Sequence, residues 1–301
     1  MGTLQAIVLG IVQGLTEFLP VSSSGHLALM EHIFGRVEGQ ADAMLAFDVL
    51  LHLASVAAIL MVLWKDAISL LTERRRLILP LIAGTIPAAI AGMLFEEYFD
   101  AAKGSLLILG AGFMFTGIVL ALAERLGRKT GRLDGVGLRE AVVIGFGQAV
   151  AILPAVSRSG MTMSSGLLMG LNRTDCLRFS FLLAIPVILG AAVKETPKML
   201  HAAGTVGLAP LVAGAAASCV FSIMAIKLLL GIVRRHPLSV FSYYVVPLGM
   251  ALFVWQAPAI FAGWAGRTLG YVLTAAIAAG VAAAAFSLLR KRPQSQSAAQ
   301  D

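Results

Sequence analysis

The sequence has little charge for its length. Only 13% of its 301 residues are charged and 58% are hydrophobic, whereas about a quarter of the residues of a soluble domain are charged. It also has only two cysteines, Cys176 and Cys219, which are too few for a disulfide framework or a cysteine-rich metal site. These shortages exclude a soluble globular enzyme and a disulfide-stabilised secreted protein. They indicate an all-α polytopic membrane protein.

Two further absences narrow the interpretation. The first five residues, Met1 to Gln5, lack the basic residues and the cleavage site of a signal peptide, so we expect the first segment to belong to the mature fold. The net charge of +7 does not indicate a nucleic-acid partner, because the lysines and arginines lie in short loops between hydrophobic runs. In a membrane protein such loops set the topology and contact anionic lipids.

Seven apolar runs are long enough to span a membrane, which takes about 20 residues. They are 43–63, 77–95, 105–123, 176–193, 208–230, 238–257 and 268–289. Two other regions, 3–35 and 140–171, are long enough for one and a half spans, but Pro, Ser and Gly interrupt each of them halfway. Lipid cannot satisfy loose backbone, so we expect each region to form a re-entrant hairpin of two half-helices buried in protein or beside a wet cavity.

The two interrupted regions are copies of one pattern. Aligned at a separation of 135 residues, they share a glutamine, two serines and a glycine: Gln13 and Gln148, Ser22 and Ser157, Ser24 and Ser159, Gly25 and Gly160. Three full spans follow each copy, which makes the hairpins enter from opposite faces, as in the inverted repeats of many transporters. We expect one membrane domain with repeat one at 1–125, repeat two at 138–257 and an additional span at 268–289, followed by a disordered tail at 293–301.

Loop charge predicts the orientation. The basic segments are 64–77, 124–139, 227–237 and 290–292, and the acidic ones are 31–42 and 96–104. Under the positive-inside rule the basic segments are cytoplasmic. The amino terminus is then periplasmic, the first hairpin opens outward and the carboxyl tail is cytoplasmic.

An ionisable residue inside a membrane segment is a functional candidate by default. Gln13 and Glu17 lie four residues apart, on one face of the first half-helix, and could together present oxygens to a divalent cation. The alternative for Glu17 is a helix-end carboxylate that reaches water, which the apolar neighbours Leu15 and Phe18 disfavour.

Three serines precede the second half-helix of the first hairpin. Ser22, Ser23 and Ser24 stand before Gly25, and free amides at a helix start next to a glycine form a cradle suited to phosphate. Capping of the helix would explain one serine but not three. His26 falls in the first helical turn, where it could act as a general acid or base; the alternative is a histidine hydrogen-bonded inside the bundle.

Arg158 is the strongest single indication in the second hairpin. It stands between Ser157 and Ser159, and Gly160 follows, so its guanidinium could bind phosphate at a second helix start. The competing interpretation is an ion pair with Glu17.

Asp48 and His52 lie four residues apart on the first full span, near its outer end. They could orient the residues that contact the substrate, or they could have a purely structural role. Two phosphate cradles, one arginine, one carboxylate and one imidazole together suit phosphoryl transfer to water from a membrane-embedded phosphate ester or anhydride. The missing electrophile is then a divalent cation, Mg²⁺ or Ca²⁺, on Glu17.

These motifs identify a resemblance. The segments 13–26 and 154–160 closely resemble the two signature regions of the undecaprenyl-diphosphatases, also called bacitracin-resistance proteins, and the likeness extends over roughly residues 1–257. The resemblance implies a multi-pass inner-membrane hydrolase that removes the terminal phosphate of undecaprenyl diphosphate. It would thereby recycle the lipid carrier of peptidoglycan synthesis and confer resistance to bacitracin. It also implies a divalent cation and a site that faces the periplasm.

The resemblance assigns roles by position. Glu17 matches the acidic residue tied to metal and catalysis, Ser23 the proposed nucleophile, His26 the catalytic histidine and Arg158 the phosphate-binding arginine. Gln13 stands where some members have a glutamate, which leaves a two-carboxylate metal site incomplete here, although its amide oxygen can still be a ligand.

Several alternatives stay open at this point. Ser23 could attack phosphorus with His26 handling the proton, or water activated by Glu17 or His26 could attack directly. The alternative function is a polyprenyl-phosphate flippase or another inverted-repeat transporter. The sequence does not decide between a monomer and a homodimer.

Overall fold

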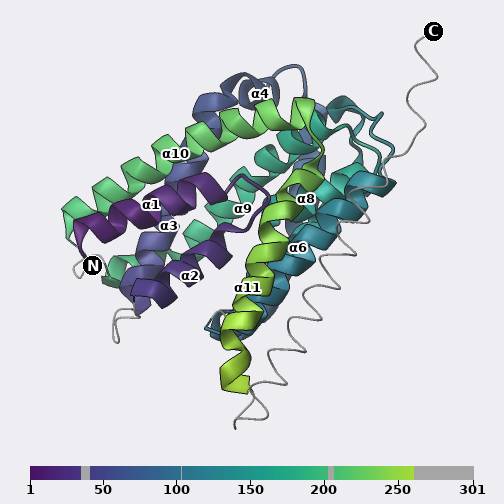
Figure 1. The fold of residues 1–301 in the computed structure, drawn as a ribbon. Coiled ribbons are helices and arrows are strands. Elements are labelled where there is room, and N and C mark those ends of the chain that lie inside the picture. Colours follow the sequence, from purple (N-terminus) through teal and green to yellow (C-terminus); the bar gives the residue numbers. More distant parts are fainter. Residues whose placement is uncertain (35–40, 103, 203–206, 261–301) are drawn as a thin grey trace.

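Six long apolar helices form most of the structure (Figure 1). The computed structural model describes residues 1–34, 41–102, 104–202 and 207–260. Within these ranges the helices long enough to span a membrane are α3 (Ala41–Val62), α5 (Ile78–Ala102), α6 (Leu106–Leu126), α9 (Arg173–Ala202), α10 (Leu208–Arg235) and α11 (Ser242–Ile260). They confirm six of the seven predicted spans. The predicted span at 268–289 and the tail at 293–301 lie outside the described residues.

Short elements connect these helices. They are α4 (Trp64–Ser69) and the 3₁₀ turns η1 (Arg75–Leu77), η2 (Leu133–Gly135) and η3 (Leu238–Phe241). The helix α9 continues to Ala202, well past the predicted end of its span at residue 193. The polar residues that follow the apolar run are therefore still part of the helix.

Both interrupted regions are pairs of short helices, as predicted. The first hairpin consists of α1 (Thr3–Thr16) and α2 (Ser23–Phe34), and the second of α7 (Leu138–Val150) and α8 (Arg158–Leu168). Each break contains one non-glycine residue in the left-handed region, Ser22 with φ 71° and Ala155 with φ 57°. Such a residue turns the chain where a helix cannot continue. The all-helical fold and both breaks are confirmed, whereas the inverted orientation of the two hairpins stays a prediction.

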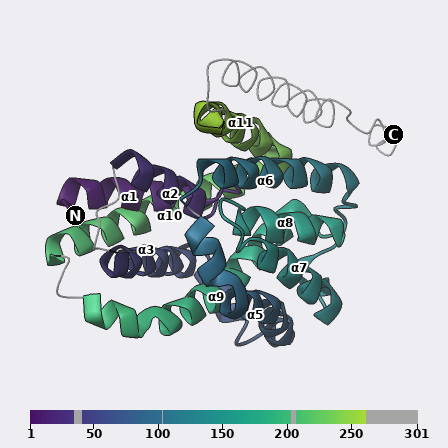
Figure 2. The same cartoon turned by 90° about the horizontal axis from the view of Figure 1, so that it is seen from below.

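The helices pack in pairs that correspond between the two halves of the chain. The helix α1 lies along α10 and α7 lies along α5, while α3 packs on α9 and α6 packs on α11 (Figure 2). At the first two crossings a glycine meets a glycine: a Cβ on Gly10 would overlap the carbonyl oxygen of Gly214, and a Cβ on Gly145 would overlap that of Gly84. Small residues that let two backbones approach are typical of helix packing in membranes.

The outer surface is apolar. Large side chains are extensively exposed on several of the long helices, among them Met93 at 69%, Val193 at 74% and Trp255 at 72%. Such surface is compatible with lipid but not with water. Together with the six spans it supports a multi-span membrane protein.

One buried carboxylate holds together the loops at one end of the bundle. Glu124, near the end of α6, accepts hydrogen bonds from the Arg173 guanidinium and from the backbone amide of Leu238, the latter at 2.9 Å. The Lys129 ammonium lies 2.7 Å from the same carboxylate. This cluster joins α6, α9 and η3.

The glycine crossing can be tested by adding one methyl group. We expect Gly10→Ala to lower the free energy of unfolding by about 1–3 kcal/mol, because the added Cβ must displace the backbone of α10. Gly190→Ala is the matched control, since a Cβ there meets nothing within 4 Å, and alanine favours helix over glycine. Melting temperatures in detergent measure both variants. Equal melting temperatures for Gly10→Ala and the parent protein would contradict the close crossing.

Candidate active site

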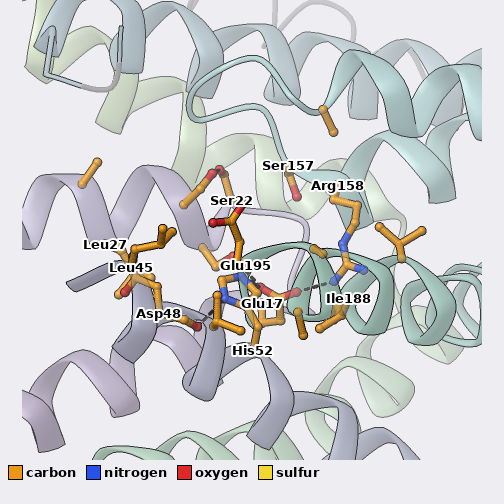
Figure 3. Close-up of a pocket in the computed structure, with 18 of the residues that line it drawn as sticks. Glu17, Ser22, Leu27, Leu45, Asp48, His52, Ser157, Arg158, Ile188 and Glu195 are labelled. Atoms are coloured by element: carbon orange, nitrogen blue, oxygen red, sulfur yellow. Dashed lines mark hydrogen bonds and ion pairs between the residues drawn. The ribbon is translucent and has the colours of Figure 1, made fainter. Parts of the chain in front are cut away.

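The tips of the two hairpins meet inside the bundle. Gly25 lies against the other hairpin so closely that a Cβ on it would come within 2.7 Å of the Ala155 side chain. The Ser159 hydroxyl donates to the carbonyl of Leu19 at 3.0 Å. Beside this contact lies a cavity of about 320 Å³, lined by both breaks and by α3 and α9 (Figure 3).

Glu17 occupies the centre of the site. It is the C-cap residue of α1 and is 5% exposed. Its Oε2 accepts hydrogen bonds from the Ser23 hydroxyl at 2.6 Å and from the Gln13 amide at 3.0 Å. The sequence predicted that Gln13 and Glu17 share a face, and they do; the structure adds the hydroxyl of Ser23 from the start of α2.

Arg158 reaches the same carboxylate from the other hairpin. It is the first residue of α8, and its Nη2 donates to Oε1 of Glu17. Its Nη1 is buried and has no hydrogen-bond partner among the described residues. The ion pair with Glu17, which competed with phosphate binding in the sequence interpretation, is thus present, and one end of the guanidinium still has donor capacity.

The aligned serines cap their own helices. The Ser22 hydroxyl accepts from the amide of Gly25 at 3.3 Å, and the Ser157 hydroxyl accepts from the amide of Gly160 at 3.1 Å. The serines at equivalent positions of the two hairpins therefore both cap the helix that follows them. At each helix start the first amides point out of the helix and suit an anion.

The six predicted phosphate-cradle residues do not all face the cavity. Ser22, Ser24 and Ser157 line it. Gly25, Ser159 and Gly160 lie behind its wall, where they join the hairpins or cap α8.

His26 is the predicted catalytic residue that the structure places elsewhere. This residue is 7% exposed and does not line the cavity. Nδ1 donates to the carbonyl of Ser22 at 2.7 Å, and Nε2 lies 2.8 Å from the hydroxyl of Tyr244, on which the ring also stacks. A carbonyl oxygen can only accept, so Nδ1 carries the hydrogen and Nε2 accepts from the tyrosine. Both nitrogens are therefore engaged away from Ser23.

His52 is the imidazole that faces the cavity. Its Nδ1 lies 2.8 Å from the carbonyl of Asp48, one turn earlier on α3, and must donate to it. Its Nε2 then points toward Glu17 and lies 3.5 Å from Oε2. Asp48 lines the cavity as well. The structure thus brings both α3 candidates to the site.

Two further carboxylates line the cavity and were not predicted. They are Glu31, on α2, and Glu195, on α9. The signal for Glu195 is its spacing: it follows Ile188 and Ala192, also lining residues, by seven and three positions, so all three share one helical face. Apolar side chains, among them Leu27 and Leu45, also line the cavity.

The donor set fits a metal only in part. Among the described residues no three His, Cys, Asp or Glu side chains gather closely enough to hold an ion. However, carboxylates outnumber cations around the cavity, and hard oxygen donors suit Mg²⁺ or Ca²⁺. The Oε1 of Gln13 is buried beside Glu17 and has no hydrogen-bond partner in the part of the chain that the structure describes. Such a site needs further oxygens from a bound phosphate, which is how Mg²⁺ is commonly held.

The arrangement suits acyl or phosphoryl transfer. A hydroxyl donates to a buried carboxylate, which is the geometry of a nucleophile beside its base. An arginine and two helix starts converge on the same space, and these groups stabilise negative charge on phosphate oxygens.

Comparisons with known proteins agree with this chemistry. The model of the family described as "Bacitracin resistance protein BacA" matches residues 6–251. An undecaprenyl-diphosphatase of Carboxydothermus hydrogenoformans is 43% identical over 265 residues, which cover 85% of this chain and 98% of that protein. Similar proteins of the same name occur in Moorella thermoacetica, at 42% identity over 82% of this chain and 95% of that protein, and in Bacteroides thetaiotaomicron, at 36% over 85% and 100%.

A double-mutant cycle tests the ion pair between the hairpins. Removing one partner leaves the other charge buried and unpaired. We therefore expect Glu17→Ala and Arg158→Ala together to lose less stability than the sum of the single variants, by about 1–3 kcal/mol. Reversible unfolding in mixed micelles gives the free energies. Glu17→Ala combined with Arg76→Ala serves as control and should be additive, because Arg76 is exposed, lies near Asp134 and does not line the cavity. Additive losses for Glu17 and Arg158 would show that the pair contributes no coupling.

Proposed function

Because the chain belongs to the bacitracin resistance protein BacA family, we propose that it is an integral membrane phosphatase that hydrolyses undecaprenyl diphosphate to undecaprenyl phosphate and inorganic phosphate. The names of its relatives support this substrate. The single observation that carries the proposal is the carboxylate of Glu17, which accepts from the hydroxyl of Ser23 and pairs with the guanidinium of Arg158. The proposed base, Glu17, thus contacts both the proposed nucleophile and the guanidinium that would bind phosphate.

Binding of the diphosphate would change the partner of Arg158. Glu17 offers the guanidinium a carboxylate in the resting structure, and a phosphate offers the same planar recognition with more charge. The unpartnered Nη1 of Arg158 supplies a second donor to the anion. The amides at the starts of α2 and α8 add fixed dipoles from the two sides.

The chemical step follows from the short contact between Ser23 and Glu17. Glu17 takes the hydroxyl proton as the Ser23 oxygen forms a bond to the terminal phosphorus. The bond from that phosphorus to the bridging oxygen breaks, and undecaprenyl phosphate leaves with the electron pair. The proton on Glu17 passes to the departing undecaprenyl phosphate, so the carboxylate is free again. Water then attacks the phosphoserine and gives a proton to Glu17, the bond from phosphorus to the Ser23 oxygen breaks, and Glu17 returns that proton to the Ser23 oxygen as inorganic phosphate leaves. In the rival mechanism Glu17 takes the proton of a water molecule that attacks the phosphorus directly.

We assign His26 a positioning role in place of the proton transfer expected from the sequence. It bonds the carbonyl of Ser22 and is itself held by Tyr244. Ser22 has a left-handed backbone, which needs support from its surroundings to persist. His26 therefore fixes the turn that aims Ser23 at Glu17.

The divalent cation remains part of the proposal. Glu17 and the Oε1 of Gln13 would hold it together with phosphate oxygens of the substrate, and when bound it would neutralise phosphate charge. Carboxylates at the cavity wall, including Glu31 and Asp48, make such neutralisation necessary for a diphosphate.

The location is proposed from charge and family. We place the protein in the bacterial inner membrane, with a periplasmic amino terminus, a cytoplasmic carboxyl terminus and the cavity open toward the periplasm. The apolar lining residues, among them Leu27, Leu45 and Ile188, would contact the first isoprene units. A transporter is not favoured by the comparisons, and it would need no hydroxyl on a buried carboxylate.

Ser23 can be tested directly as the nucleophile. We expect Ser23→Ala to reduce phosphate release from undecaprenyl diphosphate by about a thousandfold or more, since the bond-forming atom is lost. Ser24→Ala removes a hydroxyl that contacts Ser22 and not Glu17, so the loss should be at most about tenfold. Labelled terminal phosphate trapped on the acid-quenched parent protein, and absent from Ser23→Ala, would identify the phosphoserine.

The same assay separates the alternatives. An active Ser23→Ala protein would exclude the covalent mechanism in favour of direct attack by water. A parent protein that binds the lipid but releases no phosphate would exclude the phosphatase altogether.

Metal removal tests the cation. We expect a chelator to abolish phosphate release and Mg²⁺ or Ca²⁺ to restore it. Gln13→Glu, which adds a carboxylate beside Glu17, should lower the metal concentration needed for half-maximal activity, whereas Gln13→Leu should raise it. Metal titrations of the three proteins measure this. An activity that persists after chelation would contradict the proposed ligands. So would a half-maximal metal concentration that is the same for all three proteins.

A further inference from the structure

A second cavity lies on the other side of the first hairpin, and the proposed reaction does not use it. Its volume is about 420 Å³. The break contributes Thr16, Leu19 and Val21, and the end of α10 contributes Ile232 and His236; the remaining wall is Val240, Phe241 and Tyr244 from η3 and α11. We call it the α10–α11 groove. Figure 1 shows α11 running steeply away from the end of α10, so the two helices diverge at this place.

The groove suits hydrocarbon and not water. Both hydroxyls among its lining residues are used inside the protein: Thr16 donates to the carbonyl of Val12 at 2.6 Å, and Tyr244 pairs with His26 at 2.8 Å. A buried water needs two to four polar partners, and an apolar cavity of about 150 Å³ already stays dry and takes up benzene. The groove is larger than that and its remaining wall is almost entirely apolar.

The groove opens at the lipid-facing surface. Val240 is 37% exposed and Tyr244 is 50% exposed. The tip of the first hairpin supplies Leu19 and Val21 to this opening, and an apolar opening at membrane depth meets lipid chains.

Basic residues stand at one end of the groove. His236 lines it, and Arg234 and Arg235 immediately precede His236 at the end of α10. Both arginines are exposed, and neither forms an ion pair within the described part of the chain. Each arginine next to a membrane helix raises the affinity for anionic lipid by about fivefold.

From this geometry we propose that the α10–α11 groove is a binding site for an anionic phospholipid, with an acyl chain against Leu19, Val21 and Val240 and the phosphate beside Arg235 and His236. The lipid would be a structural ligand, distinct from the substrate in the catalytic cavity. It would fill the space behind the break and press on Tyr244, which holds His26.

Quenching by brominated lipids tests the site in the full-length protein. Val240→Trp places a fluorophore in the groove, and the protein is reconstituted into phosphatidylcholine vesicles that contain a fixed fraction of brominated phosphatidylglycerol or of brominated phosphatidylcholine. The signal of the parent protein is subtracted. We expect quenching by the anionic lipid to indicate about 25-fold higher affinity than quenching by the neutral one, and Arg234→Gln with Arg235→Gln to abolish the preference.

Met224→Trp is the matched control, because Met224 lies on α10, is 54% exposed and does not line the groove. It should be quenched equally by both lipids. Equal quenching at residue 240 would mean ordinary bilayer lipid without selectivity, and no quenching there would mean that protein covers the groove; either result overturns the proposal. Neither result depends on phosphate release, so this test stands apart from that of the phosphatase.

Discussion

A helix that ends inside a membrane leaves backbone groups that lipid cannot satisfy, and in this chain two such ends satisfy each other. The hydroxyls of Ser22 and Ser157 cap their own helices, and the hydroxyl of Ser159 crosses to the carbonyl of Leu19 in the other hairpin. Close approach of the tips requires Gly25, because a side chain there would meet Ala155. The polar cavity is a consequence of this contact, since both breaks bring their polar residues to one place.

Glu17 connects the structural requirement to the chemistry. Burial of a carboxylate is costly, and its pairing with Arg158 offsets that cost without adding much net stability. The pair does fix the register of the two hairpins, because a guanidinium from one must meet a carboxylate from the other. The pair also keeps Arg158 in the cavity. There the carboxylate of Glu17 occupies the position on the guanidinium that a substrate phosphate would take. In the proposed reaction a phosphate would replace the carboxylate on Arg158, while Glu17 keeps its hydrogen bonds from Ser23 and Gln13.

The local signals in the sequence predicted most of this arrangement. Six spans and both hairpins follow from runs of apolar residues and from the breaks at Pro20 and Pro154. The ion pair between Glu17 and Arg158 was one of the two roles that the sequence left open for the arginine, whereas the hydrogen bond from Ser23 to Glu17 is added by the structure. The sequence could not show which face of α2 meets α11, and this decides the direction of His26: its partner Tyr244 lies 218 positions away in the chain. Glu195 was missed because the apolar run ends before the helix does.

The first break lies between the catalytic cavity and the α10–α11 groove, and this position explains the order of its residues. Phe18 packs edge-on against Phe181 of α9, with ring centroids 5.0 Å apart, and anchors the end of α1. Leu19 and Val21 face the α10–α11 groove, whereas Ser22 and the serines after it face the cavity. The change of side falls at Ser22, the residue with the left-handed backbone. A polar residue at position 19 or 21 would meet the apolar lining of the groove, and an apolar one at 22 would leave the amide of Gly25 without its acceptor. The apolar letters between the carboxylate and the serines are therefore as necessary to the site as the polar ones.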